Sequence, residues 1–152
     1  MKSAIWLTWL LAAGTTLGGC SGTDDHNERN ARENLALWLE KGPPSYVYVI
    51  RTACFCKDLE PVRVVVENGV VQSSLGVDSG KEIPEITMTE MLQNVVKRAS
   101  HDNAVFEARY DPALGYLTFL DVDVDAQIAD DEFTTTVSCL GAGIGDDVCA
   151  KP

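Results

Sequence analysis

Four stretches of the chain are rich in β-branched and aromatic residues, a pattern that is typical of strands. Residues 45–55 and 132–140 each predict one strand, and residues 62–75 and 104–122 each predict a hairpin. The first hairpin contains Asn68-Gly69, the pair that a tight two-residue turn prefers, because both positions need a positive φ. The second hairpin turns within residues 111–115, where proline and glycine favour a turn.

Two other segments place apolar residues at helical spacing. The first predicted helix begins near residue 31 and ends where Gly42 is followed by two prolines. The second begins at Thr87, which has the spacing to form a capping box with Glu90. The expected buried stripes are Ala31, Leu35, Trp38 and Leu39 in the first helix and Met91, Leu92, Val95, Val96 and Ala99 in the second.

The elements follow the order helix, strand, hairpin, helix, hairpin, strand (α-β-ββ-α-ββ-β), without the βαβ alternation of parallel sheets. This order predicts an α+β fold: an antiparallel sheet of about five to six strands with two helices packed on one face. Residues 31–140 form this single domain, and residues 141–152 form a Gly- and Asp-rich tail. The two helix-plus-strands halves resemble a loose internal duplication, although no residue-level repeat accompanies it.

Residues 1–19 have the pattern of a secretory signal peptide: a charge at Lys2, a short apolar run, then small residues. The run is much shorter than the ~20 apolar residues that span a bilayer. The segment Leu17-Gly18-Gly19-Cys20 resembles the lipobox of bacterial lipoproteins. The resemblance implies that Cys20 becomes the first residue of the mature protein and carries acyl chains such as palmitate, which bind it to a membrane. The alternative is an ordinary secreted protein in which Cys20 is incidental.

The lipobox also implies a place in the cell. Residues 20–30 comprise the lipidated cysteine and a polar segment, which we interpret as a tether between lipid and domain. In a Gram-negative cell, Ser21 stands where an aspartate would retain the protein in the inner membrane, so the outer membrane is expected. In other bacteria the outer face of the cell membrane is expected.

The net charge of −11 becomes −12 when residues 1–19, whose only charge is Lys2, are removed. Such acidity argues against nucleic acid as a partner. It is compatible with a cationic partner, with a divalent metal, or with solubility alone.

Cysteines supply a second set of candidates. Of the five in the chain, lipidation of Cys20 leaves four in an oxidising compartment, where disulfides persist: Cys54, Cys56, Cys139 and Cys149. Four cysteines allow three pairings. In an extended strand, the Cα atoms of residues i and i+2 are about 6.6 Å apart, near the upper limit for a disulfide. A Cys54–Cys56 bridge therefore requires a bend in the strand. A zinc ion held by all four is a further alternative, which the exported compartment disfavours.

An acidic segment, residues 121–132, has the ligand spacing of a calcium loop. The ligands would be Asp121, Asp123, Asp125, Gln127 and Glu132. Ala126 stands where such loops need glycine, and the flanking segments predict strands rather than helices. A solvated acidic turn between two strands is therefore the alternative. Apart from this possible calcium, the sequence indicates no cofactor.

Enzyme signatures are missing from the sequence. Its two histidines, His26 and His101, fall in the polar segment and at a helix end, and no nucleophile elbow, zinc-protease or phosphate-loop motif occurs. A hydrolase that uses carboxylates such as Asp121 and Asp123 is a weaker hypothesis.

Several short motifs, taken in their order, resemble a bacterial family known only as domain of unknown function 6174. They are Trp38, Tyr46-Val-Tyr48, Cys54-Phe-Cys56, Val64-Val-Val66, Tyr110-Asp111-Pro112, Gly115-Tyr116, Asp121-Val-Asp123 and residues 129–133. The resemblance covers roughly residues 31–138 and implies an α+β domain in the cell envelope, but it does not point to any activity. Since the family pattern carries the Cys-x-Cys alone, two local bridges are favoured, Cys54–Cys56 and Cys139–Cys149, the second tying the tail to the last strand. We therefore expect a lipid-anchored, non-enzymatic envelope module that binds an envelope partner or has a structural role.

Overall fold

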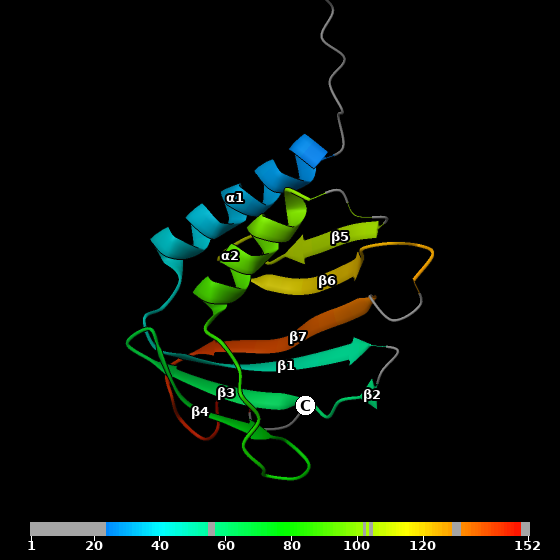
Figure 1. Ribbon diagram of the computed structural model, residues 1–152. Helices are drawn as coiled ribbons and strands as arrows, with labels where there is room; N and C mark the ends of the chain where they lie inside the picture. The colour runs from blue at the N-terminus through cyan, green and yellow to red at the C-terminus, as the bar shows by residue number, and fades with distance from the viewer. Residues whose placement is uncertain (1–23, 55–56, 102, 104, 129–131, 150–152) are drawn as a thin grey trace, which may run out of the picture.

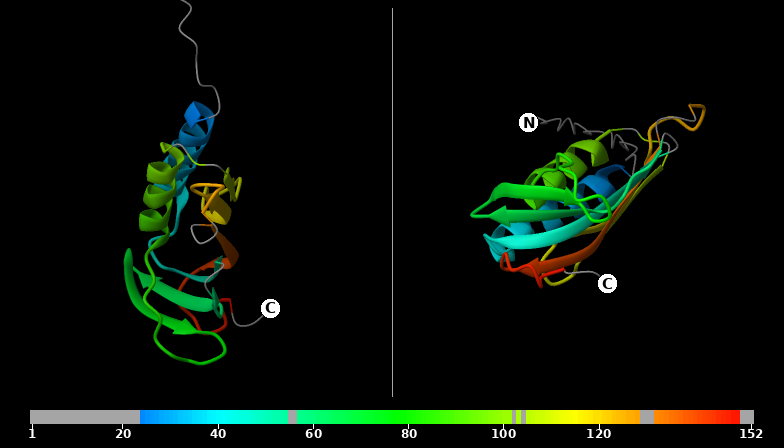
Figure 2. Two further views of the ribbon diagram at one scale, coloured as in Figure 1. Left: turned by 45° about the vertical axis from the view of Figure 1, so that its right-hand side comes forward. Right: turned by 90° about the horizontal axis from the view of Figure 1, so that it is seen from below.

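The protein folds as one antiparallel sheet with two helices on one face, as Figures 1 and 2 show for the computed structural model. The structure describes residues 24–54, 57–101, 103, 105–128 and 132–149. The helices are α1 (Asp24–Lys41) and α2 (Met88–Ala99). The strands are β1 (Tyr46–Cys54), β2 (Lys57–Asp58), β3 (Val62–Glu67), β4 (Val70–Gly76), β5 (Val105–Tyr110), β6 (Leu117–Asp123) and β7 (Phe133–Ala142).

The sheet order is β4-β3-β1-β7-β6-β5, and the two-residue strand β2 pairs with the end of β1. The predicted α+β class and the order α-β-ββ-α-ββ-β are confirmed. The order also argues against an internal duplication. The first half runs from the centre of the sheet (β1) to one edge (β4), whereas the second runs from the other edge (β5) to the centre (β7).

Helix α1 begins earlier than the sequence predicted. It begins at Asp24, inside the segment 20–30 that we interpreted as a tether, so residues 24–30 are helical. Polar side chains support this first half: Arg32 Nε donates to Glu28 Oε1 over 2.8 Å, and the Asn34 amide donates to the Asn30 carbonyl over 2.8 Å. Leu39 also differs from the prediction, because 63% of it is exposed.

The N-terminus of α2 is fixed by aromatic side chains of β1 and α1. The Tyr46 hydroxyl accepts a hydrogen bond from the Met88 N–H over 2.9 Å, and the Tyr48 hydroxyl donates to the Ile86 carbonyl. Trp38 packs edge-on against Tyr46, with ring centroids 5.2 Å apart. Its indole N–H donates to the Thr89 hydroxyl over 3.0 Å. Both helices are thereby positioned over the same end of β1.

The predicted capping box of α2 is present. The Thr87 hydroxyl accepts from the Glu90 N–H over 3.2 Å, and the Glu90 carboxylate accepts from the Thr87 N–H over 2.9 Å. The Thr87 hydroxyl also donates to this carboxylate over 2.8 Å. The two bonds that the carboxylate accepts, the backbone bond first, favour its ionised form and lower the pKa of Glu90. The predicted apolar stripe of α2 is buried beneath the helix.

Strand β1 is buried on both faces over its first five residues. Tyr46, Tyr48 and Ile50 face the helices and belong to the main core. Val47 and Val49 point to the opposite face, yet their exposed fractions are only 0% and 8%. Something other than the helices must therefore cover the second face of the sheet at β1.

Two turn glycines have positive φ but different surroundings. In the β3–β4 turn, Asn68 (φ 51°) and Gly69 (φ 75°) confirm the predicted tight hairpin, and a Cβ on Gly69 would meet nothing within 4 Å. Gly115 (φ 77°) ends the β5–β6 turn against α1, where a Cβ would lie 2.4 Å from the Asn34 carbonyl oxygen.

This contrast predicts two different costs for the same substitution. Gly69→Ala is expected to lower the free energy of unfolding by about 1 kcal/mol, since only backbone strain opposes it. Gly115→Ala adds a clash with helix backbone and is expected to cost about 2 kcal/mol more. Urea denaturation of both variants measures the difference. Equal costs would show that α1 does not press on this turn.

Candidate functional site

The sheet face opposite the helices, here called the outer face, carries a row of side chains across four strands. Cross-strand partners share a face, and Val49 pairs with Arg63 on one side and with Cys139 on the other. Arg63 pairs in turn with Leu75 of the edge strand β4. A bulge in β7 inserts Ser138 beside this row, where the register shifts between Val49 and Ile50.

The C-terminal segment, residues 143–149, lies against the outer face. It begins at Gly143 (φ 91°), whose N–H donates to the Ser45 carbonyl over 3.0 Å. A disulfide joins Cys149 to Cys139 of β7, with Cα atoms 5.8 Å apart. The Arg63 guanidinium donates to two carbonyls of the segment, Gly145 over 3.0 Å and Val148 over 3.2 Å. One covalent bond and one cation therefore hold the segment over Val47 and Val49.

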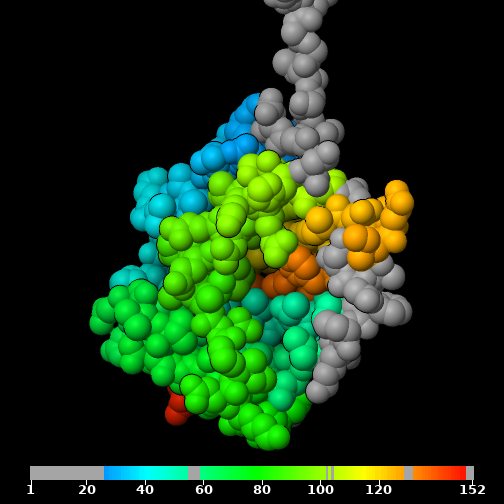
Figure 3. Space-filling model, viewed as in Figure 1, coloured from blue at the N-terminus to red at the C-terminus, as the bar shows by residue number. Residues whose placement is uncertain are grey.

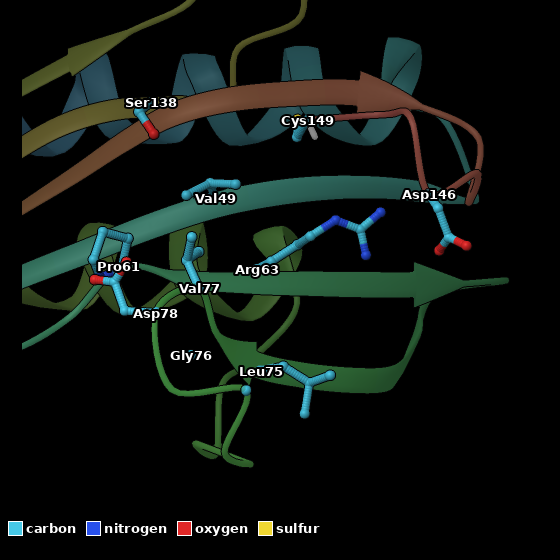
Figure 4. Close-up of a pocket in the computed structure, with 11 residues that line it drawn as sticks. Val49, Pro61, Arg63, Leu75, Gly76, Val77, Asp78, Ser138, Asp146 and Cys149 are labelled. Atoms are coloured by element: carbon cyan, nitrogen blue, oxygen red, sulfur yellow. The ribbon is translucent and has the colours of Figure 1, made fainter. Parts of the chain in front are cut away.

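A pocket of about 520 Å³ lies beside this segment on the outer face (Figure 4). Its apolar walls come from β1, β4 and the connections near them, and its polar groups are a guanidinium, two carboxylates and a hydroxyl. In Figure 4 the Arg63 side chain extends along the sheet toward Asp146. The lining residues are Val49, Pro61, Arg63, Leu75, Gly76, Val77, Asp78, Gly80, Ser138, Asp146 and Cys149.

Backbone hydrogen bonds fix the wall of the pocket that follows β4. The Glu60 carboxylate accepts from the N–H groups of Asp78 (3.0 Å) and Ser79 (2.9 Å), and the Val77 N–H donates to the Pro61 carbonyl over 2.8 Å. Hydrogen bonding by Ser79, first from its side chain and then from its backbone, lowers the pKa of Glu60. Because the wall is held by its own bonds, the pocket does not depend on a ligand for its shape.

The chemistry of this pocket suits binding. Its volume lies within the range of small-molecule sites, which are mostly apolar with a few polar groups that orient the ligand. Apolar surface from Val49, Leu75 and Val77 would contact a ligand, and 43% of Leu75 is exposed before any ligand binds. The charged groups Arg63, Asp78 and Asp146 line the same pocket.

The cysteines divide into two groups in the structure. Cys139 pairs with Cys149, one of the two local bridges that we favoured, so crossed pairing of these two with Cys54 or Cys56 is ruled out. The same bond leaves no thiolates at two of the four positions of a zinc site. Cys54 is disulfide-bonded, but Cys56 lies outside the described residues, so the Cys54–Cys56 bridge stays a prediction. Cys20 also lies outside them.

The acidic residues of the predicted calcium loop are only partly brought together. Asp121 and Asp123 belong to β6 rather than to a loop, and the Thr134 hydroxyl donates to Asp121 over 3.1 Å. Asp125 accepts from the backbone N–H of Gln127 over 3.0 Å. Asp121 and Glu132 line one pocket of about 280 Å³. Among the residues that the structure describes, which exclude 129–131, no group of three acidic, histidine or cysteine side chains is arranged to hold a metal.

Comparison with known proteins gives a family and no activity. A model described as a family of unknown function, DUF6174, matches residues 30–142. No curated protein and no solved structure shows a significant match to the chain. Within the described part of the chain, neither helix is long and apolar enough to cross a bilayer.

Proposed function

The chain belongs to the DUF6174 family of unknown function, and we propose that it is a non-enzymatic binding module of the bacterial cell envelope, anchored by lipid on Cys20. The observation that carries the binding role is the preformed outer-face pocket of about 520 Å³. The lipobox-like segment 17–20 supports the anchor. Two alternatives compete with a small-molecule ligand: the module binds an envelope protein, or it has a purely structural role.

The ligand of the outer-face pocket is a small, mostly apolar molecule. Val49, Leu75 and Val77 supply its contact surface, and burying such surface is favourable by about 25 cal/mol per Å². Arg63 stabilises the pocket rather than the ligand, because it donates to the carbonyls of Gly145 and Val148. The disulfide has the same role, since Cys149 lines the pocket itself.

Binding of the uncharged fluorescent probe N-phenyl-1-naphthylamine tests this role. Leu75→Asn is expected to weaken the affinity for the probe at least about fivefold, because roughly 1 kcal/mol of apolar contact is lost. Val105→Asn is the matched control, because Val105 is 44% exposed and Leu75 is 43% exposed, and Val105 lies on the other edge strand. A double Cys139→Ser, Cys149→Ser variant should also weaken the probe and lose about 3 kcal/mol of stability. If Leu75→Asn and Val105→Asn bind alike, the pocket is not the site.

The anchor is tested by the intact mass of protein purified from bacterial membranes. We expect a mature chain that begins at Cys20 and carries acyl chains, and we expect Cys20→Ala to abolish both acylation and membrane association. Recovery of an unacylated chain from the wild type would leave an ordinary secreted protein as the correct interpretation.

Calcium binding by the segment 121–132 is the second candidate function. The observation that favours it is Asp123 Oδ1, which is buried and makes no hydrogen bond within the described residues. A buried carboxylate oxygen needs a donor or a cation, and Ca²⁺ prefers oxygen ligands. A hydrolase that uses Asp121 and Asp123 has no such observation in its favour, because the Thr134 hydroxyl already engages Asp121.

Thermal unfolding in the presence of calcium or a chelator tests this site. A calcium concentration ten times Kd should raise the free energy of unfolding by about 1.4 kcal/mol, and Asp123→Asn should remove the effect. Magnesium serves as the control ion, since it demands a tighter octahedral geometry. An unchanged melting temperature at millimolar calcium would exclude the site.

A further inference from the structure

A second pocket lies on the helix side of the sheet, between α2 and strands β1, β6 and β7. Its volume is about 200 Å³, and Figure 3 shows a hollow between α2 in light green, β7 in orange and β1 in teal. Ile50 lines this pocket and Val49 lines the outer-face pocket, on opposite faces of β1. The two pockets share no lining residue. We call it the inner pocket.

The floor of the inner pocket is apolar. Ile50 of β1, Leu117 and Leu120 of β6, and Met91 and Val95 of α2 all belong to the main core and line it. At about 200 Å³ it is smaller than the 300–1,000 Å³ typical of sites for drug-sized ligands. Because these five side chains are at most 6% exposed, they close the floor. The apolar surface open to one small group comes from Ile86, which is 36% exposed, and from the half-buried Phe133.

Polar groups of both signs line the same small space. Glu85 precedes α2 and Arg98 lies in its last turn. The hydroxyls of Thr52 on β1 and Thr135 on β7 lie 3.3 Å apart and line the same pocket. The Arg98 guanidinium stacks over the Phe133 ring, with its central carbon 4.8 Å from the centroid. Within the described residues, neither Glu85 nor Arg98 forms an ion pair.

Glu85 is poorly matched to its surroundings. Burial raises the pKa of its carboxyl, and the backbone hydrogen bond from Ile86 only partly offsets this. A half-buried carboxylate without an opposite charge is costly, so a cationic group that enters the pocket would be favourable there. Arg98 favours an anionic group, since a guanidinium binds a carboxylate with two parallel hydrogen bonds.

We propose that the inner pocket binds a small zwitterion with an apolar side chain, of the chemical class of the free apolar α-amino acids. The ammonium group of the ligand lies at Glu85, its carboxylate lies at Arg98, and its side chain contacts Ile86 and Phe133 above the closed floor. This role is separate from the proposed function of the outer-face pocket.

Three probes of one shape test the need for both charges on the wild-type protein. L-leucine carries both, 3-methylbutylamine lacks the carboxylate, and 4-methylpentanoate lacks the ammonium group. Calorimetric titration is expected to give leucine at least about tenfold tighter binding than either analogue, since each lost charged contact is worth a factor of that order. Equal binding of leucine and either analogue, or no binding of leucine at about 10 mM, a concentration above the millimolar range of weak sites, would overturn the proposal.

Charge-neutralising variants locate the site. Glu85→Gln and Arg98→Gln are each expected to weaken the affinity for leucine about tenfold. Glu82 and Lys97 are neighbouring exposed charges that do not line the pocket, so Glu82→Gln and Lys97→Gln should change this affinity less than about twofold. Leu75→Asn, in the outer-face pocket, should also have no effect.

Loss of leucine binding in Glu85→Gln is not expected to come from loss of folding. A raised carboxyl pKa favours folding below the unfolded-state pKa, and that contribution is lost as pH rises through the folded-state pKa. At neutral pH the substitution removes a cost, so this variant should be at least as stable as the wild type. Unaltered leucine binding in both Glu85→Gln and Arg98→Gln would show that leucine binds elsewhere.

Discussion

The structure depends on a central strand that is buried on both faces. A sheet with a single layer of helices normally leaves its other face to solvent, and polar residues then alternate with apolar ones. The first half of β1 departs from this, because Val47 and Val49 are nearly as buried as Tyr46 and Tyr48. The C-terminal segment supplies the missing cover, and the Cys139–Cys149 bond and Arg63 hold it there. The outer-face pocket lies beside that cover, and Val49 and Cys149 both line it.

On the helix side, the same strand determines where α2 lies. Tyr46 and Tyr48 fix the backbone at the start of α2, and Trp38 connects α1 to both. Tyrosine hydroxyls reach farther from the sheet than aliphatic side chains do. The helix therefore begins at a distance that the shorter residues further along β1, Ile50 and Thr52, do not fill, and the inner pocket lies over them. Both pockets are consequences of how one strand is covered.

The fold class was predictable because its signals are local. The Asn68-Gly69 turn, the Thr87–Glu90 capping box and the stripe of α2 each involve residues within a few positions of one another. The features that build the pockets are not local. The pairing of β1 with β7 joins residues about ninety positions apart, and only that pairing brings Cys139 beside Val49. Arg63 was missed for this reason: in the sequence it is one polar position in a half-buried strand. The early start of α1 was missed because polar side chains, and not an apolar stripe, support residues 24–30.

Arg63 and Arg98 stand out because the chain as a whole is strongly acidic. Acidic residues outnumber lysine and arginine by 23 to 12, so most of the surface favours cations. Arg63 and Arg98 place a positive charge in each of the two pockets, on opposite faces of the sheet. They differ in what they offer a ligand. Arg63 is already bonded to two backbone carbonyls and so stabilises a wall, whereas Arg98 stacks on Phe133 and lines the inner pocket. Recognition of an anionic group therefore belongs to the inner pocket, and apolar contact belongs to the outer one.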